Sequence, residues 1–151
     1  MVRLLITGSR TWDDYNYILK TLTDFETNSP DKNIVLVSGE CPDGADRLCE
    51  IAAKALGWEI ELYPADWNQY GKRAGFLRNE QMVNTQPDVC IGFVRNRSKG
   101  GSMTVRLADK AGILTIAHYW DDTPAKVFSV KAFQKESPIS MDKPEEEPTL
   151  F

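Results

Sequence analysis

The sequence predicts an α/β fold, a three-layer sandwich with a mainly parallel five-stranded sheet in the strand order 3-2-1-4-5. Short apolar runs at residues 2–7, 34–38, 89–93 and 114–117 are typical of strands buried on both faces. Segments with helical spacing of apolar residues separate these runs, and polar turns that contain glycine follow several of the strands. Because such strands pair in parallel through right-handed crossovers, the polar turns should gather at one edge of the sheet.

The first strand leads directly into the turn Gly8, Ser9, Arg10. Thr11 and Asp14 then resemble a capping box that would start the first helix. A glycine turn between a buried strand and a helix N-terminus suits an anion, because free backbone N–H groups converge there. Such turns also occur as simple tight connections, so this one alone is weak evidence for a site.

The second strand ends in a polar turn over residues 39–46, and a helix closed by Gly57 follows. Asp43 and Asp46 fall in the first turn of that helix, where carboxylates satisfy N–H groups but repel a phosphate. Ribose hydroxyls would fit this turn better. For Asp43, a purely structural role as the helix N-cap is an equally good interpretation.

Residues 59–63 alternate acidic and apolar side chains, which predicts a strand at the edge of the sheet. The polar loop after it contains Asp66 and Trp67. The Trp67 ring could stack on a nucleobase or cover the end of the sheet.

A helix is predicted from about residue 72 to about residue 84. Gly75, Arg78, Asn79 and Met82 are three and four positions apart and share one of its faces. This face would offer a gap, a cation, an amide and an apolar wall to a ligand. The alternative is that Arg78 is a solvated surface residue and Gly75 a packing contact.

The loop after the fourth strand is the best phosphate site in the chain. Adjacent glycines open a helix whose first turn carries no acid, and several cations surround it. The loop residues are Gly100, Gly101, Ser102 and Thr104, and the cations are Arg95, Arg97, Lys99 and Arg106.

The composition suits one folded domain over residues 1–120, followed by an extension over residues 121–151. The extension holds four of the eight prolines and seven acids against four lysines, so partial disorder is expected there, with a short helix or strand at residues 127–133 as an alternative. The extension accounts for −3 of the net charge of −4. The body is therefore nearly neutral, which favours a small anionic ligand and makes nucleic acid an unlikely partner.

No apolar run reaches the roughly 20 residues of a membrane span, and the N-terminus lacks a basic, then apolar, signal pattern. No membrane partner and a cytoplasmic location are expected. Cys41, Cys49 and Cys90 have no metal-ligand spacing, and His118 is the single histidine, read here as structural. We therefore expect reduced cysteines, no metal and no cofactor.

In the predicted strand order, the sheet changes direction between the first and fourth strands, and ligands bind in the crevice at such a point. The expected ligand-binding residues are those of the polar turns and of the helix face around Arg78. They are Gly8, Ser9, Arg10, Gly39, Asp43, Gly44, Ala45, Asp46, Asp66, Trp67, Arg78, Asn79, Met82, Gly100, Gly101, Ser102 and Thr104.

Five motifs together resemble the YspA-like, YpsA-related branch of the SLOG superfamily, a Rossmann-like set that includes the Lonely Guy phosphoribohydrolases and DNA-processing protein A. They are I-T-G-S-R (6–10), S-G-E-C-P-D-G-A-D-R (38–47), P-A-D-W (64–67), G-K-R-A-G-F-L-R-N-E-Q-M (71–82) and G-G-S-M-T (100–104). The resemblance covers residues 2–120. It implies binding of a nucleotide or an NAD- or ADP-ribose-derived ligand by a sensor, carrier or sequestering protein, and by analogy a homodimer or higher homo-oligomer.

Matched residue by residue, Arg78 and Met82 resemble the R-x-x-x-M of Lonely Guy enzymes, and the Gly100 loop resembles part of their G-G-x-G-T-x-x-E loop. Two positions depart from the pattern: Met103 replaces a glycine, and Leu107 stands where their catalytic glutamate would be. Hydrolysis of an N-glycosidic bond is therefore the alternative function, and single-stranded DNA binding is a third. Catalytic residues for hydrolysis would come from Arg78, Asp46 or Asp66, with Asp43 as a further carboxylate.

Overall fold

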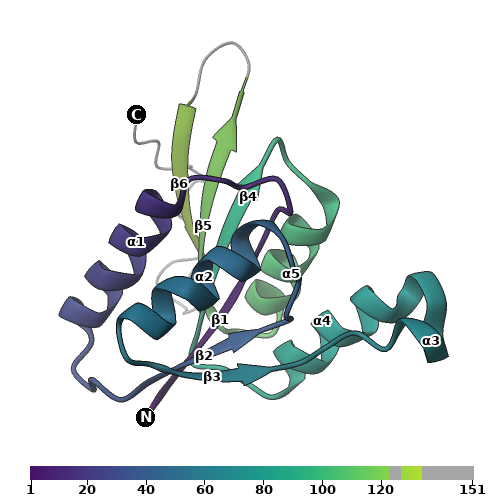
Figure 1. The fold of residues 1–151 in the computed structure, drawn as a ribbon, viewed down its shortest axis with the longest axis horizontal. Coiled ribbons are helices and arrows are strands. Elements are labelled where there is room, and N and C mark those ends of the chain that lie inside the picture. Colours follow the sequence, from purple (N-terminus) through teal and green to yellow (C-terminus); the bar gives the residue numbers. More distant parts are fainter. Residues whose placement is uncertain (123–126, 134–151) are drawn as a thin grey trace, which may run out of the picture.

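The computed structural model describes residues 1–122 and 127–133, and its core is one twisted sheet (Figure 1). The strand order is β3-β2-β1-β4-β5-β6. Neighbouring strands from β3 to β5 are parallel, as predicted, and β6 is antiparallel to β5. The strands are β1 (Val2–Gly8), β2 (Ile34–Ser38), β3 (Glu59–Leu62), β4 (Val89–Arg95), β5 (Leu114–Asp121) and β6 (Val127–Phe133). The predicted α/β class and the order 3-2-1-4-5 are confirmed.

The expectation of five strands was wrong by one, because β6 completes a six-stranded sheet. Because these residues lie in the acidic, proline-rich extension, a strand there was expected only as an alternative to partial disorder, and the structure has the strand. Phe128 of β6 stacks on Tyr17 with ring centroids 4.6 Å apart, and on Trp120 at 5.5 Å. These contacts continue the aromatic core past residue 120. The rest of the extension, where partial disorder was expected, lies outside the described residues.

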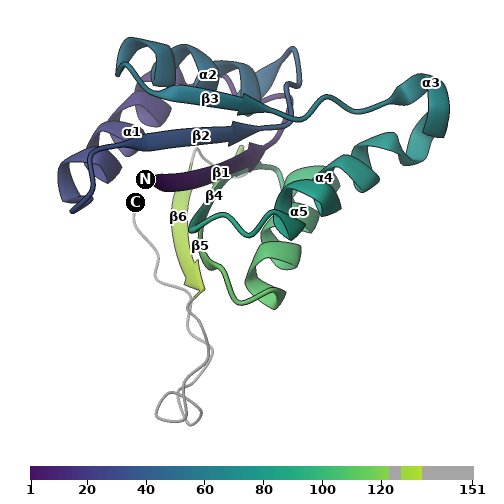
Figure 2. The same cartoon turned by 90° about the horizontal axis from the view of Figure 1, so that it is seen from below.

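Helices cover both faces of the sheet, giving the three layers (Figures 1 and 2). Helices α1 (Tyr15–Asn28) and α2 (Gly44–Ala55) lie on one face, and α4 (Ala74–Asn84) and α5 (Lys99–Lys110) on the other. Successive side chains of a strand point to opposite faces. Leu4 and Ile6 accordingly pack in the core cluster below α1 and α2, and Leu5 packs in the cluster below α4 and α5. Among the described residues, no helix has the length and apolar character needed to cross a bilayer.

The first helix begins one turn later than the predicted capping box would place it. Asp14, not Thr11, is its N-cap, and the Asp14 carboxylate accepts a hydrogen bond from the Tyr17 N–H at 3.0 Å. Such a cap stabilises a helix by about 1 kcal/mol. The residues between strand and helix are used for packing, because Trp12 is buried against Phe93 and Trp120.

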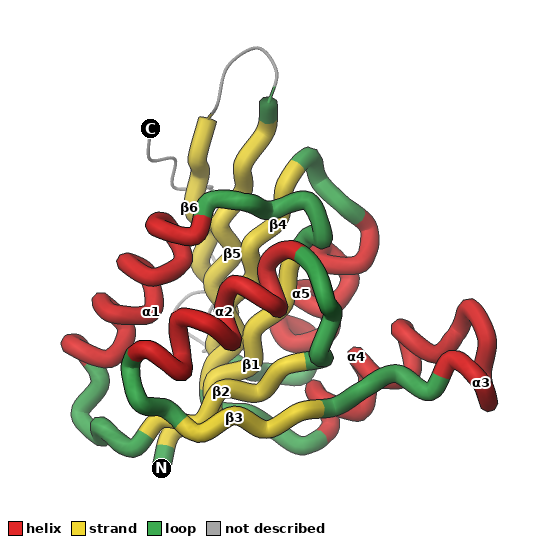
Figure 3. Tube along the Cα trace, in the orientation of Figure 1, coloured by secondary structure: helices red, strands yellow, loops and turns green. Residues whose placement is uncertain are grey.

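The chain leaves the edge strand β3 in an extended link that carries α3 (Trp67–Tyr70) away from the sheet (Figure 3). As predicted, β3 is an edge strand, and it pairs with β2. A 3-10 turn, η1 (Gly71–Arg73), then leads into α4, which runs back toward the body (Figure 2). This geometry brings Arg78, in the first half of α4, next to the turn that follows the carboxyl end of β2.

Candidate functional site

Gly8, at the carboxyl end of β1, is the point where the site's backbone segments meet. A Cβ on Gly8 would lie 2.5 Å from the Ala45 Cβ, and a Cβ on Gly101 would lie 3.2 Å from the Gly8 Cα. Only glycine permits such close approach. The N-termini of α2 and α5 therefore converge on the end of β1, which brings the turns at residues 8–10, 39–46 and 98–104 together where the strand order predicts a crevice.

Ser9 ties two of these turns together from the inside. Its side chain is buried; its Oγ accepts a hydrogen bond from the Arg95 N–H at 2.8 Å and lies 2.5 Å from the Ser98 Oγ. Its carbonyl oxygen accepts from the Ala45 N–H at 3.0 Å, at the start of α2. The Ser9 hydroxyl thus serves internal hydrogen bonds. Sequence reasoning missed Ser98, although a serine just before a helical segment is a typical N-cap signal.

Gly44 holds the start of α2 against the first turn. Its φ is +72°, and a Cβ there would lie 2.5 Å from the carbonyl carbon of Arg10 and closer still to the Ser9 carbonyl oxygen. The Arg10 side chain is exposed at this point. The structure therefore brings Arg10 and the β2–α2 turn side by side.

Arg78 reaches back from α4 to the same turn. Its Nη1 donates to the Gly39 carbonyl oxygen, and its Nε donates to the Asn79 Oδ1 at 2.8 Å. Burial lowers the pKa of the Arg78 guanidinium, while the nearby Asp46 carboxyl favours its charge. An arginine remains charged under such conditions. The buried Asn79 holds this cation in place, so Arg78 is a fixed positive charge at the crevice.

Asp46 is a buried carboxyl on the inner face of α2. It accepts a hydrogen bond from the Cys41 N–H at 3.2 Å, and burial raises its pKa from 3.8 to about 6 against the opposing effects of that bond and of Arg78 and Arg10. Glu50, one helical turn later, is also buried and accepts a hydrogen bond from the Ser38 Oγ at 2.7 Å. Sequence reasoning missed Glu50 and Ser38. The pattern that could have found Glu50 is its spacing four residues after Asp46, which places both carboxyls on one helix face.

The raised pKa of Asp46 predicts a specific dependence of stability on pH. Since the folded state binds this proton more tightly than the unfolded state, the contribution of Asp46 is full below about pH 4 and is lost as the pH rises through 6. The loss should approach about 3 kcal/mol, the equivalent of the shift. Urea unfolding of wild type and Asp46→Asn between pH 4 and 7 measures it. The variant should lack this component, and identical pH profiles would contradict it.

The structure does not bring all the predicted residues to the crevice. Met82 is 2% exposed and packs in the core with Leu5 and Val37. Asp66 is exposed and caps α3, accepting from the Gln69 N–H at 3.1 Å. Asp43 does lie in the β2–α2 turn beside the crevice, where it is exposed and makes no side-chain capping bond.

Trp67 lies at the border of the site. Half of its surface is exposed. A Cβ on Gly75 would lie 3.3 Å from the Trp67 ring and 3.8 Å from the Arg78 Nη2. Because Gly75 has no side chain, the indole and the guanidinium can both lie next to it.

The N-terminus of α5 is the predicted phosphate loop. The first backbone N–H groups of a helix have no partner within it, which makes this end attractive to an anion. Ser98 is the N-cap but makes no side-chain capping bond, because its Oγ is directed to Ser9. Gly100 and Ser102 lie at the surface of this first turn, while Thr104 is buried and bonds back to the Gly100 carbonyl oxygen at 3.4 Å.

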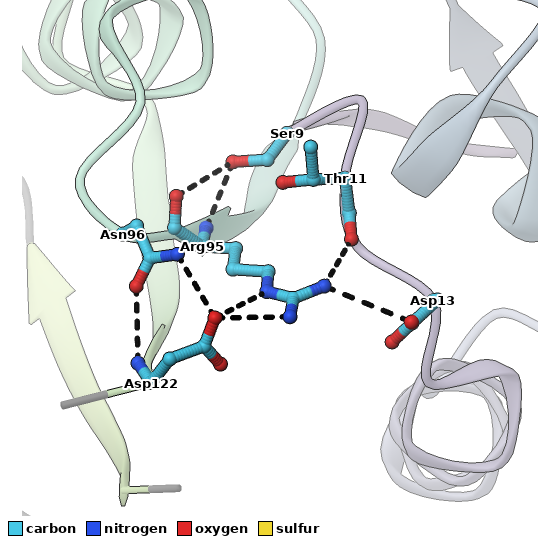
Figure 4. A network of polar contacts seen from close by, with 6 residues as sticks. All are labelled: Ser9, Thr11, Asp13, Arg95, Asn96 and Asp122. Atoms are coloured by element: carbon cyan, nitrogen blue, oxygen red, sulfur yellow. Dashed lines mark hydrogen bonds and ion pairs between the residues drawn. The ribbon is translucent and has the colours of Figure 1, made fainter. Parts of the chain in front are cut away.

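Arg95, expected to surround the phosphate loop, is committed to a different network (Figure 4). Its guanidinium donates to Asp122 at 3.0 Å and to the Thr11 carbonyl oxygen at 2.6 Å, and lies 3.7 Å from Asp13. It also stacks over Trp120, 4.3 Å from the ring centroid. Arg95 therefore joins the first turn to the end of β5. The cations beside Asp46 are Arg10 and Arg78.

Two cavities lie away from the crevice. One of about 380 Å³ lies between the C-terminal ends of α4 and α5, and one of about 570 Å³ lies between α1 and the sheet. Neither is lined by the predicted binding residues. Among the described residues, no three or more His, Cys, Asp or Glu side chains form a group suited to a metal ion. The candidate site consists of the backbone turns that converge on Gly8 and of the cations Arg10 and Arg78.

Known proteins resemble this chain over the part that contains two of these turns. The model of the YspA, cpYpsA-related SLOG family matches residues 2–70, which contain the turns after β1 and β2. The Gene 61 protein of Mycobacterium phage D29 is 41% identical over 121 residues, which cover 77% of this chain and 95% of that relative. The match over nearly the whole relative, together with the family model, shows that the chain belongs to the YspA, cpYpsA-related SLOG family.

Proposed function

We propose that the protein binds a nucleotide or an NAD- or ADP-ribose-derived molecule in this crevice, as a sensor, carrier or sequestering protein. The observation that carries the proposal is the convergence of the α2 and α5 N-termini on Gly8, with Arg78 fixed beside them. Converging helix N-termini and cations favour phosphate groups. Membership of the SLOG family supports a nucleotide-related ligand.

The parts of the crevice suit different parts of such a ligand. A phosphate would sit at the first turn of α5 with Arg10 and Arg78, because no acid lies in that turn. Ribose hydroxyls would face Asp46, which is a hydrogen-bond acceptor when ionised. The base would pack on the exposed indole of Trp67.

A second candidate function is hydrolysis of an N-ribosyl bond. Leu107 argues against it, because this side chain packs against the apolar core where Lonely Guy enzymes would carry a glutamate. Asp46 argues for it, because a buried carboxyl with a pKa of about 6 is partly protonated near neutral pH and could act as an acid.

Mass spectrometry of small molecules released on denaturing the freshly purified protein tests the proposal. We expect an intact nucleotide or ADP-ribose-type molecule in near-stoichiometric amount. Titration calorimetry with ADP-ribose, NAD and AMP follows, with chromatography of each mixture for free base. Release of base would favour the hydrolase. Absence of a bound nucleotide together with no heat of binding would contradict both functions.

A further inference from the structure

The cavity of about 570 Å³ between α1 and the sheet lies near the amino ends of β1, β4 and β5, away from the crevice. Four of its lining side chains are apolar, only partly buried and packed against the main core: Val2, Phe25, Val89 and Ile116. Ile91, which also lines it, is 2% exposed. A cavity of this size whose walls are mostly apolar is typical of a site for a small molecule.

The cavity exists because α1 packs on α2 and not closely on the strands (Figures 1 and 2). Helix α2 has close backbone contacts with β1, β2 and β3, whereas the main backbone contacts of α1 are with α2. On this face, no described helix lies closely on β4 and β5, which α5 covers from the other face. An apolar molecule under α1 would therefore remove partly open core side chains from water, which is favourable.

His118 places one polar group in this apolar wall. The Tyr17 hydroxyl lies 2.6 Å from the His118 Nδ1, and neither side chain makes another hydrogen bond within the described part of the chain. The hydroxyl hydrogen has no other acceptor there, so Tyr17 donates to Nδ1. Burial lowers the pKa of His118 to about 4 and raises that of Tyr17 to about 12, so both groups are neutral near pH 7. The proton of the neutral ring is therefore on Nε2.

The Nε2–H group of His118 is free to meet a ligand. Residues 1–122 and 127–133 supply no partner for Nε2, and this atom is not fully buried. Because the side chain lines the cavity, the N–H donor is available there. The ring is also held in place, since it stacks on Phe93 with centroids 5.3 Å apart. A donor fixed in this way binds an acceptor without first losing side-chain freedom.

The charges around the cavity favour an uncharged ligand. No arginine or lysine is among the described lining residues, and the lining carboxylates of Asp24 and Asp88 are exposed. The amino group of Met1 is paired with Asp31. An anion would find no free cation here, and a cation would be repelled by the His118 N–H. A buried charge without a partner is costly, so neither kind of ion suits the interior of the cavity.

We propose that this cavity binds a mainly apolar, uncharged small molecule whose polar end accepts a hydrogen bond from the His118 Nε2. This binding is independent of the proposed function, because none of the lining residues belongs to the crevice.

Titration of the full chain with prodan, an uncharged naphthalene fluorophore that carries one ketone, tests the site. We expect a dissociation constant in the micromolar range and a blue shift of the prodan emission, because the ring leaves water. Anilinonaphthalene sulfonate, an anion of similar size, should bind about tenfold more weakly, since no free cation lines the cavity. Excess ADP-ribose should not displace prodan.

Thr21→Phe tests whether prodan occupies the cavity. Thr21 is partly buried on the cavity side of α1, so the larger side chain should fill the space and abolish binding. Thr23→Phe is the matched control, because Thr23 is exposed on the same helix and does not line the cavity. This control should bind prodan as wild type does.

His118→Phe tests the hydrogen bond. It should weaken prodan binding about tenfold, the equivalent of one hydrogen bond. An analogue of prodan with a methylene in place of the ketone should bind wild type and variant equally. A purely structural role of His118 would instead change both affinities alike.

Nitrogen NMR of wild type supplies a readout that needs no variant, because His118 is the single histidine of the chain. The spectrum should show the proton on Nε2, and prodan should shift this Nε2–H resonance. A proton on Nδ1, no binding of prodan, binding that survives Thr21→Phe, displacement by ADP-ribose, or tighter binding of the anion would each overturn the proposal.

Discussion

Replacing Gly44 with alanine should lower the free energy of unfolding by about 2–5 kcal/mol. The backbone of Gly44 has a φ of +72°, and a side chain in this left-handed region costs about 1–2 kcal/mol. The new methyl group would also lie 2.5 Å from the Arg10 carbonyl carbon and closer to the Ser9 carbonyl oxygen. Both neighbours are backbone atoms that cannot rotate away, and overpacking of this kind costs about 1–3 kcal/mol. Urea unfolding monitored by tryptophan fluorescence measures the change.

Gly112→Ala is the matched control for Gly44. Gly112 has a φ of +81°, and no atom lies within 4 Å of the position that its Cβ would take. This variant should therefore lose only the conformational term of about 1–2 kcal/mol. Equal losses in the two variants would show that the close approach of α2 to the first turn is not a rigid feature of the site. If the approach is rigid, Gly44→Ala should also weaken ligand binding by displacing Arg10.

The sheet and the position of its polar edge could be predicted because both follow from local patterns. Buried strands and amphipathic helices alternate along the chain, and this alternation determines a parallel sheet and the side on which its turns lie. The turns that follow β1 and β4 do lie side by side, because a Cβ on Gly101 would lie 3.2 Å from the Gly8 Cα. The sixth strand was predicted only as one of two alternatives, a short helix or strand, because its pairing with β5 rather than its own composition makes it a strand.

The spacing of residues on α4 predicted a shared face but not what that face would meet. Arg78 and Met82 are four residues apart, yet Arg78 reaches the crevice and Met82 is buried in the core. The reason is that α4 starts beside α3, away from the sheet, and runs into the body, so the elements that it contacts change along its length (Figure 2). Likewise, Arg95 is withdrawn from the phosphate loop by Asp122, a residue 27 positions away that no local pattern connects to it.

Replacing Arg78 with alanine should weaken binding of ADP-ribose about 100-fold. Arg78 is a partly buried cation held by Gly39 and Asn79, so it meets an anion without first losing side-chain freedom. Loss of a charge-assisted hydrogen bond in such a setting costs about 2–5 kcal/mol, and about 2.7 kcal/mol corresponds to a factor of 100. Calorimetry at low and moderate salt measures the affinity.

Lys54→Ala separates this local effect from the loss of one positive charge. Lys54 is exposed in the last turn of α2, at the end opposite the crevice, so its removal changes the net charge equally but should alter affinity less than twofold. Arg78→Lys should lie between wild type and Arg78→Ala, because an ammonium keeps the charge but cannot donate to both Gly39 and Asn79 in the same planar geometry. Unchanged affinity in a folded Arg78→Ala variant would place the anion elsewhere. In that case the guanidinium would serve only to join α4 to the β2–α2 turn, and its removal would appear as a loss of stability alone.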